Sequence, residues 1–217
     1  MTRRIGAICM KLVAGTAAFL VFGNLAILAA SWWAQGAVTP AGASVDEVAG
    51  ISNFTAVDTH LWRGGAPSAE GYRNLAAAGV TTVVDLRAED GLDADVRIVE
   101  ELGMRLVRIP IRDGQAPSMD KVEEFLAATE ESGGTVFVHC GAGVGRTGTM
   151  VGAYLVEQAD VGRGNAVRRN LAVGPPSLEQ LAFVAGLERG DIDKPNSLLT
   201  AVSRVLDAPR RLWVRIG

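Results

Sequence analysis

The sequence predicts an α/β fold, with a central, mostly parallel sheet of four to five strands flanked by helices and an N-terminal transmembrane or signal helix. Three observations lead to this prediction. Short β-branched and aromatic runs alternate with longer amphipathic runs between residues 57 and 139. Glycine or proline stands at most of the boundaries between them. An apolar run of 22 residues, from Leu12 to Trp33, lies near the start of the chain. The alternation implies a parallel sheet covered by helices on both faces.

Residues 1–35 form a separate N-terminal segment. Arg3, Arg4 and Lys11 precede the apolar run, which is long enough to cross a bilayer as a helix. A basic head predicts that the N-terminus stays inside and that the remaining chain lies outside the cytoplasm. A cleaved signal peptide is the alternative, and the Arg3-Arg4 pair hints at a twin-arginine signal. We favour a retained membrane anchor over export after cleavage.

The remaining chain divides into a linker, a domain and a tail. Residues 36–52 are rich in small residues and predict a flexible tether. Residues 53–190 predict the domain, in which the fourth strand is followed by helices alone. The expected strands are 57–63, 80–87, 104–110 and 135–139, and the expected helices are 69–78, 93–102, 119–131, 147–158, 164–172 and 177–187.

The tail, residues 191–217, is amphipathic and basic. Its apolar residues recur at helical spacing at Leu198, Leu199, Val202, Val205 and Leu206. A basic end that carries Trp213 follows. Such a segment packs on its own domain, the interpretation that we favour, or lies on a lipid surface.

Composition limits the classes of function. The chain has 217 residues and a net charge of −3, which leaves room for one domain of ordinary size and disfavours nucleic acid as a partner. One of its two cysteines, Cys9, lies in the N-terminal segment and the other, Cys140, in the domain, so a disulfide framework within the domain is excluded. With only two histidines, His60 and His139, the sequence predicts no metal site, and it implies no cofactor.

The most informative stretch runs from Val136 to Gly148. A short apolar strand breaks into a glycine-rich turn, which opens a helical pattern. Loop N–H groups and the positive end of a helix dipole together form a cradle for an anion. Cys140 lies at the mouth of this turn, where the thiolate form of a cysteine is favoured. Arg146 offers a planar fork that binds two phosphate oxygens.

Three simpler interpretations compete with this one. A buried cysteine is often an inert small hydrophobe, but glycines and an arginine follow Cys140 instead of a packed apolar run. Residues 143–148 also fit a dinucleotide-binding glycine pattern, which requires an acidic residue about 20 positions later. Residues 166–170 are basic there and read as helical. The Gly-Lys-Ser/Thr ending of a Walker loop is absent.

The motif His139-Cys140-(five residues)-Arg146-Thr147 resembles the signature loop of the cysteine-dependent tyrosine and dual-specificity phosphatases. The likeness extends from about Asp58 to Leu187 and is strongest toward a bacterial, dual-specificity-like branch. It implies that the backbone N–H groups of Gly141, Ala142, Gly143, Val144, Gly145 and Arg146 bind phosphate. It also implies that Thr147 stabilises the departing thiolate and that His139 orients the loop from behind.

Two arginines lie in stretches that resemble the front half of the same phosphatases. Arg63 follows Trp62 before a glycine-proline turn, and Arg87 ends a β-branched strand. Either arginine is able to contact substrate. We favour the alternative that both brace loops.

A second chemical element lies between Ile109 and Pro117. The leaving oxygen of a phosphate ester needs a proton, which an aspartate on a loop can supply. In the resembling family this aspartate follows a strand that ends in proline, some tens of residues before the cysteine. Asp113 fits, because it lies 27 positions before Cys140 (140 − 113 = 27). We favour it over Asp120, which suits the first turn of the following helix.

The sequence therefore predicts a phosphatase that acts through a phosphocysteine intermediate, on phosphotyrosine proteins and, as further candidates, on phosphoserine and phosphothreonine proteins. One alternative is a phosphoinositide or inositol phosphate phosphatase. Relatives that act on such substrates often carry lysines in the loop, and residues 141–145 contain none. The other alternative is a phosphate-binding module without catalysis, against which the presence of both Cys140 and Asp113 argues.

Overall fold

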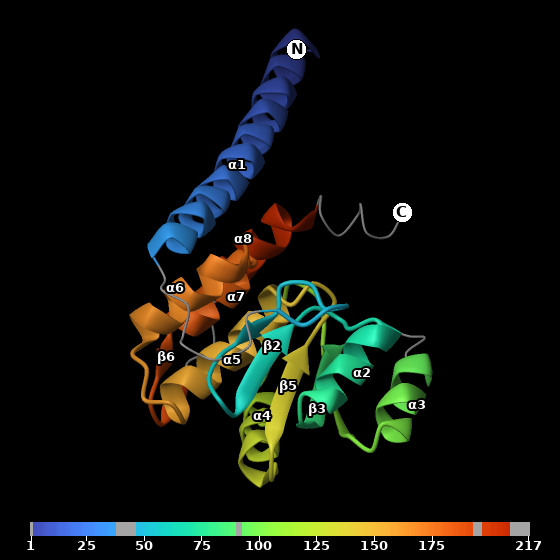
Figure 1. Cartoon of the computed structure of the whole chain (residues 1–217). Coiled ribbons are helices and arrows are strands. Elements are labelled where there is room, and N and C mark those ends of the chain that lie inside the picture. Colours follow the sequence, from blue (N-terminus) through green and yellow to red (C-terminus); the bar gives the residue numbers. More distant parts are fainter. Residues whose placement is uncertain (1, 38–46, 90–92, 193–196, 209–217) are drawn as a thin grey trace.

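A five-stranded, mostly parallel sheet forms the centre of the protein, as the sequence predicted (Figure 1). The computed structural model describes residues 2–37, 47–89, 93–192 and 197–208. The strand order is β1-β2-β5-β3-β4. Within this sheet, only the β1–β2 pair is antiparallel. The strands are β1 (Thr55–Ala56), β2 (Leu61–Gly64), β3 (Val80–Arg87), β4 (Arg105–Ile111) and β5 (Thr135–His139).

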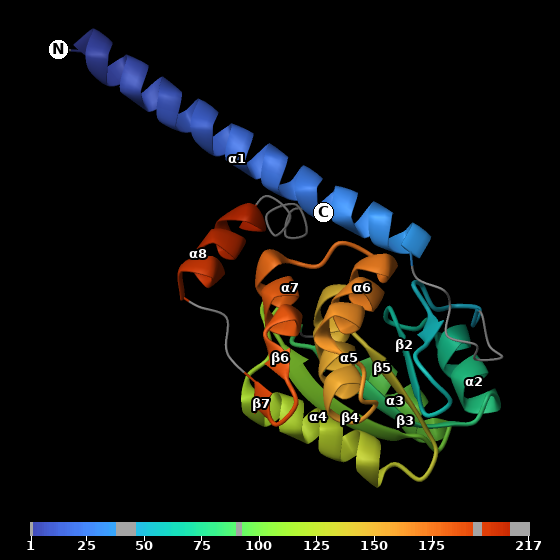
Figure 2. The same ribbon diagram turned by 90° about the vertical axis from the view of Figure 1, so that its left-hand side faces the viewer.

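Helices cover both faces of this sheet (Figures 1 and 2). One face carries α2 (Ala69–Ala77) and α3 (Asp93–Glu101), and the other carries α4 (Met119–Glu131), α5 (Gly145–Glu157), α6 (Arg163–Val173) and α7 (Leu178–Ala185). Alternating strand residues point to opposite faces, so Val83 packs toward α2 and α3 while Val84 packs toward α4 and α5. Each face therefore has its own hydrophobic core.

The strand that the sequence predicted at residues 57–63 is a hairpin instead. β1 ends at Ala56, and β2 begins at Leu61 and runs back beside it. Asp58 makes the turn, because its Oδ1 accepts hydrogen bonds from the N–H groups of His60 and Leu61, both at 2.8 Å. An aspartate that bonds its own backbone in this way ends a strand that apolar patterning alone would continue.

The prediction that only helices follow the fourth strand is wrong in one place. β6 (Leu187–Glu188) and β7 (Asp191–Ile192) form a small antiparallel pair. Gly190 lies in the turn with a φ of +76°. A ladder of two residues per strand is too short to show an alternating pattern, which explains why the sequence did not reveal it.

Part of the expected linker belongs to the domain. Val48 and Ile51 are buried in the core that contains Tyr72 and Leu75 of α2. The domain therefore begins near residue 48, while residues 38–46 lie outside the part of the chain that the structure describes. Two isolated apolar residues among small ones give no periodic signal, although they fill a hydrophobic site.

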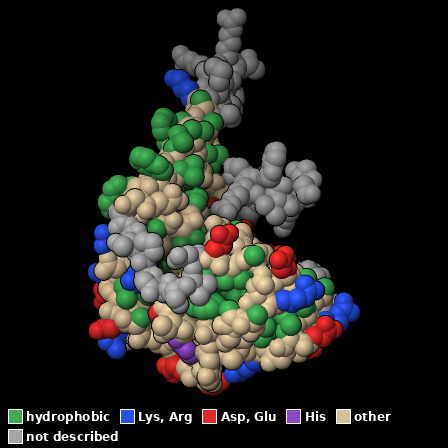
Figure 3. Space-filling model, viewed as in Figure 1, with side chains coloured by type: hydrophobic (Ala, Val, Ile, Leu, Met, Phe, Trp, Pro, Cys, Tyr) green, Lys and Arg blue, Asp and Glu red, His purple; other side chains and the backbone are tan. Residues whose placement is uncertain are grey.

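The N-terminal helix α1 (Thr2–Ala37) projects from the domain (Figures 1 and 2). Residues Ala14–Gly36 are long and apolar enough to cross a membrane, and apolar side chains stand out along the helix in Figure 3. Its last turns are not free. Ser31 is buried and donates a hydrogen bond to the Leu171 carbonyl of α6 at 2.7 Å, and Ala34 is also buried.

The tail forms helix α8 (Ser197–Leu206), which packs against α7 and also approaches α1. Ser203 and Leu206 are buried, whereas Leu198 and Val205 are 71% and 50% exposed. The Leu206 side chain lies beside Gly23 of α1, 2.9 Å from where a β-carbon would stand. Packing on the protein itself thus accounts for one side of the predicted helix. The basic end, 209–217, lies outside the described residues.

Candidate active site

The site is built where the parallel strands end. β2, β5, β3 and β4 run in one direction, and their ends are aligned by the pairs Gly64–His139, Asp85–His139 and Arg87–Ile111. The loops that follow these strands therefore meet at one edge of the sheet, the usual place for a site in a parallel sheet. The signature loop follows β5, which lies between β2 and β3.

The carbonyl groups of the signature loop are tied to surrounding segments. Neighbouring segments supply a donor to each carbonyl from Gly141 to Val144: Ala66 N–H to Gly141 (2.9 Å), Asn53 Nδ2 to Ala142 (2.9 Å), and Arg63 Nη2 to Gly143 (2.7 Å) and Val144 (3.3 Å). With the carbonyls turned outward, the peptide N–H groups are available to the concavity around Cys140.

Arg63 is a brace for this loop rather than a substrate contact. Its side chain is buried, and burial lowers its pKa to about 10, so it stays cationic near neutral pH. The charge of a buried guanidinium must be matched by acceptors. Gly143 and Val144 supply them with their carbonyl oxygens. This arrangement agrees with the bracing role that the sequence favoured.

Gly143 is required by the shape of the loop. Its φ is +75°, a left-handed conformation that side-chain-bearing residues rarely adopt. A β-carbon at this position would stand 2.3 Å from the carbonyl carbon of Gly64. The close approach of the β2 and β5 ends therefore depends on the absence of a side chain.

Cys140 lies almost fully buried at the floor of the concavity. Its Sγ accepts a hydrogen bond from the Gly143 N–H at 3.3 Å. Helix α5 begins at Gly145, so the positive end of its dipole lies beside the loop. Sγ, one loop N–H and a helix N-terminus are thus brought together at this end of β5.

Arg146 extends from the first turn of α5 into the same region. Its Nη1 donates to Glu89 Oε2 at 2.9 Å and to the Ile111 carbonyl at 3.2 Å, and its Nε lies 3.5 Å from Asp113 Oδ1. Burial would lower the pKa of Arg146, but the hydrogen bond to Glu89 and the negative charges of Cys140 and Asp113 outweigh this effect and raise the pKa. Arg146 is therefore a permanent cation at the site.

Asp113 and Cys140 line one pocket. The pocket contains about 400 Å³ of space, including its open mouth, and is lined by Asp113, Gly114, Cys140, Ala142, Gly145, Ser177, Gln180 and Asp207. The Asp113 side chain is 52% exposed, so it reaches both solvent and the pocket. Asp120 does not line this pocket and lies in the first turn of α4.

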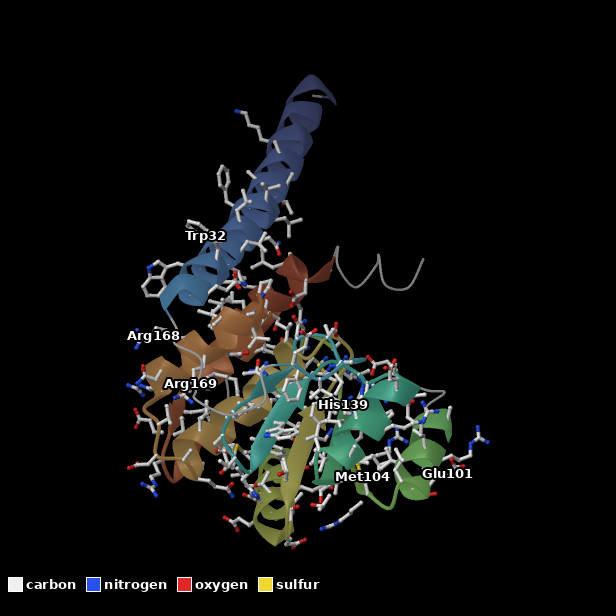
Figure 4. All side chains as sticks on the ribbon, viewed as in Figure 1. Trp32, Glu101, Met104, His139, Arg168 and Arg169 are labelled. Atoms are coloured by element: carbon white, nitrogen blue, oxygen red, sulfur yellow. The ribbon has the colours of Figure 1, made fainter. Side chains whose placement is uncertain are left out.

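His139 lies behind the loop in the interior of the sheet (Figure 4). Burial lowers its pKa to about 4, so the ring is neutral at physiological pH. Its Nδ1 stands 3.3 Å from the Cys140 carbonyl oxygen. The ring therefore lies beside the first peptide group of the signature loop, and its role in orienting the loop stays a prediction from the resemblance.

Arg87 completes the rear of the site. Its Nη2 pairs with Asp85 Oδ2 at 2.8 Å and with Asp95 Oδ2 at 2.6 Å. Burial would raise the pKa of Asp85, but the hydrogen bonds from Arg87 outweigh it and lower the pKa. Arg87 therefore joins β3 to α3, as a brace does.

Thr147 has a buried hydroxyl that has no hydrogen-bond partner within the described ranges. The proton of this hydroxyl is therefore available to an acceptor near the start of α5. Its role toward the thiolate stays a prediction from the resemblance.

The residues of the site that were not predicted from the sequence include Glu89, Ser177, Gln180 and Asp207. Glu89 follows β3 by two residues and binds Arg146. Gln180 Nε2 donates to the Gln115 carbonyl, and its Oε1 accepts from Ser177 N–H in a capping box at the start of α7. The Ser-x-x-Gln spacing of that box is a signal that the sequence offers.

The fold and this loop place the chain in the superfamily of cysteine-dependent tyrosine and dual-specificity phosphatases. The chain belongs to the family described as "DSP-PTPase phosphatase fused to NAD+ Kinase", whose model matches residues 39–186.

Curated relatives match over short stretches. The chain is 42% identical over 64 residues to a tyrosine-protein phosphatase CDC14 homolog of Schizosaccharomyces pombe, a match that covers 29% of this chain and 12% of that protein. It is 35% identical over 100 residues to a chloroplastic NAD kinase 2 of Arabidopsis thaliana, which covers 43% and 10%. The chain thus spans about an eighth or less of the length of these relatives.

A solved structure supports the fold. The catalytic domain of the PP-IP phosphatase SIW14 of S. cerevisiae superposes with a TM-score of 0.55 at 16% identity. The match covers 64% of this chain and 87% of that one.

Proposed function

We propose that this protein hydrolyses phosphate monoesters through a phosphocysteine intermediate. One observation carries the proposal: Cys140 and Asp113 line one pocket, Arg146 Nε lies 3.5 Å from Asp113 Oδ1, and the Gly143 N–H is already bonded to Sγ. A nucleophile, an anion-binding fork and a proton donor are the groups that this reaction needs. The family and the relatives named above support the same chemistry.

The first step forms a bond between sulfur and phosphorus. The Cys140 thiolate attacks phosphorus while the bond from phosphorus to the leaving oxygen breaks, and Asp113 gives its proton to that oxygen. The loop N–H groups and Arg146 hold the three other phosphate oxygens, on which negative charge is spread. Arg146 exchanges its bond with the half-exposed Glu89 for bonds to these oxygens.

The second step releases phosphate. A water molecule attacks phosphorus, Asp113 takes one of its protons, and the bond to sulfur breaks with its electron pair returning to Sγ. In this proposal the Thr147 hydroxyl donates a hydrogen bond to the Cys140 thiolate as the bond to phosphorus breaks. Asp113 and Cys140 thereby return to their starting forms.

The proposed substrates are phosphotyrosine proteins, with phosphoserine and phosphothreonine proteins as further members of the class. Arg146 contacts Asp113 at the pocket, whereas the residues that line the pocket itself include no lysine or arginine. A substrate with several phosphates needs more cations than this. Inositol phosphates are the alternative, since a similar fold belongs to a PP-IP phosphatase.

We further propose that α1 is retained as a membrane anchor and that the domain lies outside the cytoplasm. The apolar side chains of α1 are largely exposed, as a lipid-facing helix requires. Figure 4 shows Trp32 near the domain end of α1, on the side where Arg168 and Arg169 project from α6. Tryptophan and arginine suit a membrane interface. Alkaline phosphatase fused after residue 50 tests the topology, and an inactive fusion would contradict it.

The catalytic proposal is tested with the full chain in detergent. Phosphotyrosine, phosphoserine and inositol phosphate substrates are compared by phosphate release, with Cys140→Ser alongside. We expect turnover of phosphotyrosine peptides by the natural chain, and retained binding with loss of turnover in the variant. Equal turnover by Cys140→Ser would refute the mechanism. Binding without turnover by the natural chain would favour a phosphate-binding module.

A further inference from the structure

We propose that Leu206, the last residue of α8, is a positioning residue for the proton donor Asp113, and that it acts by packing α8 against the N-terminal helix α1. This inference rests on the proposed function, because it concerns the loop that supplies the proton. α8 contacts both α1 and α7, and its C-terminal end points toward α1 in Figure 2. The contacts run from α1 to the loop of Asp113 in three steps.

The first step is the contact between α1 and α8. Leu206 is buried, and its Cδ2 lies 2.9 Å from where a β-carbon on Gly23 would stand. β-carbons in proteins essentially never come this close to another atom, so the glycine leaves the room that Leu206 occupies. α1 is itself held to α6 by the hydrogen bond from Ser31 Oγ to the Leu171 carbonyl. The end of α8 therefore packs on a helix that is fixed to the domain.

The second step joins α8 to α7 at Glu179. The Glu179 N–H donates to Ser203 Oγ at 2.8 Å, and Ser203 Oγ in turn donates to Asp207 Oδ2 at 3.4 Å. Arg204 Nε lies 3.6 Å from Glu179 Oε2. The side chain of Glu179 is only 7% exposed, and a buried carboxylate must be matched by donors or cations. α8 therefore supports both the backbone and the side chain of this residue.

The third step reaches the loop of Asp113. Glu179 Oε1 accepts the Ala116 N–H, three residues after Asp113, at 3.1 Å. Asp207 Oδ2 lies 3.4 Å from where a β-carbon on Gly114 would stand. The loop thus contacts α8 directly and is also held by a residue that α8 supports. A displacement of the end of α8 would change the position of Asp113 in the pocket that it shares with Cys140.

Such a displacement acts on proton transfer rather than on phosphate binding. A proton donor contributes about 10²- to 10⁴-fold to a rate, and only within hydrogen-bond reach of the leaving oxygen. A misplacement of about 1 Å, caused far from the chemistry, can cost about 10²-fold. The signature loop is tied instead to Asn53, Arg63 and Ala66, which lie outside α8. Loss of the contact between Leu206 and α1 should therefore slow substrates whose leaving group needs a proton.

The experiment measures kcat of the full chain in detergent with a phosphotyrosine peptide and with p-nitrophenyl phosphate, whose leaving group needs no proton. Gly23→Leu displaces Leu206. We expect kcat to fall about tenfold for the peptide and less than about twofold for p-nitrophenyl phosphate. Gly15→Leu is the matched control, because it makes the same change in α1 where a β-carbon would have nothing within 4 Å. It should leave both values unchanged.

Two further variants make the test decisive. Leu206→Ala removes the same contact from the side of α8, so we expect a loss of about fivefold for the peptide alone, which decides the question where Gly23→Leu does not fold. In an Asp113→Asn background, Gly23→Leu should cause no further loss, because two changes that act through one group are not additive.

The possible outcomes separate this inference from the proposed function. Equal losses on both substrates, an equal loss in Gly15→Leu, an undiminished loss in the Asp113→Asn background, or natural kcat values in both Gly23→Leu and Leu206→Ala would overturn the role of Leu206 and leave the proposed function standing. Absence of turnover by the natural chain overturns the proposed function and this inference with it.

Discussion

The signature loop and the loop that carries Asp113 meet at one pocket, but they are held in different ways. The signature loop receives hydrogen bonds from Asn53, Arg63 and Ala66, which come from the segments around β2. The other loop is held by α7, through Ser177 Oγ to the Gly114 carbonyl (2.8 Å) and Gln180 Nε2 to the Gln115 carbonyl (3.2 Å).

This difference matches two chemical tasks. A cradle for a transition state works best when its donors are fixed before the substrate arrives. A proton donor must reach a leaving oxygen whose position depends on the substrate, and Asp113 is half exposed on a loop held by side chains of α7 and by its ion pair with Arg146 of α5. The comparison teaches that the fold fixes the anion-binding half of the site more firmly than the proton-transfer half.

The largest effect is expected from the cradle. Arg146→Lys keeps the charge but removes the planar fork, so we expect kcat to fall about 10²- to 10³-fold. Steady-state kinetics with a phosphotyrosine peptide measure this loss. Arg105→Lys, at an exposed ion pair with Glu131, is the matched control. A loss of kcat below about fivefold in Arg146→Lys would show that the positive charge alone, without the planar guanidinium, is sufficient for catalysis.

Substitution in the loop that carries Asp113 is expected to lower kcat by less, and by an amount that depends on the substrate. Asp113→Asn removes the proton donor, and we expect kcat to fall about 10²-fold for a phosphotyrosine peptide. The loss shrinks for p-nitrophenyl phosphate, whose leaving group needs no proton. Asp120→Asn on α4 is the control. Equal losses on both substrates would assign Asp113 a structural role.

Two glycines with the same backbone angle compare the loops directly. Gly143 and Gly114 both have a φ of +75°. Gly143→Ala adds a clash with the Gly64 backbone and is expected to destabilise the fold by about 3 kcal/mol, whereas Gly114→Ala, near only the Asp207 side chain, costs about 1 kcal/mol. Urea denaturation measures both. Equal values would contradict the tighter packing of the cradle.

The smallest expected effect is a dependence of the free energy of unfolding on pH, which arises from His139 behind the signature loop. The pKa of His139 is lowered to about 4 by burial, so the unfolded chain takes up a proton first as pH falls below the ordinary value of 6.5. Stability is then lost, by about 1.5 kcal/mol between pH 6.5 and 5. Asp85, whose pKa is lowered, titrates below this window. Urea denaturation at both pH values compares the natural chain with His139→Gln, and an equal change in both would reject this origin.

The parts of the fold that the sequence predicts are those whose residue pattern lies within one contiguous segment. The strand, glycine loop and helix from Val136 to Tyr154 are contiguous, and their residue types determine both structure and placement of Cys140 and Arg146. The Ser68 cap of α2 is equally local, since its Oγ accepts the Gly71 N–H at 3.1 Å. Patterns of this kind are visible without knowledge of the tertiary fold.

The residues that escaped prediction reach the site through tertiary packing. Glu89 and Asp207 are ordinary acidic residues in their own segments, and only the meeting of the β3 end and the α8 end with the pocket gives them a role. Val48 and Ile51 escaped for the same reason, since their burial depends on α2 and not on their neighbours in sequence. No periodicity within a segment encodes such contacts.

The junction between α1 and α6 bears on how the newly made protein matures. A peptidase that removed residues 1–35 would take away Ser31, the donor to the Leu171 carbonyl, together with the buried Ala34. It would also expose the Leu206 side chain, which packs beside Gly23 of α1. The proposed retention of α1 therefore has a structural consequence: a chain shortened in this way would lose the contacts that hold α1 against α6 and α8.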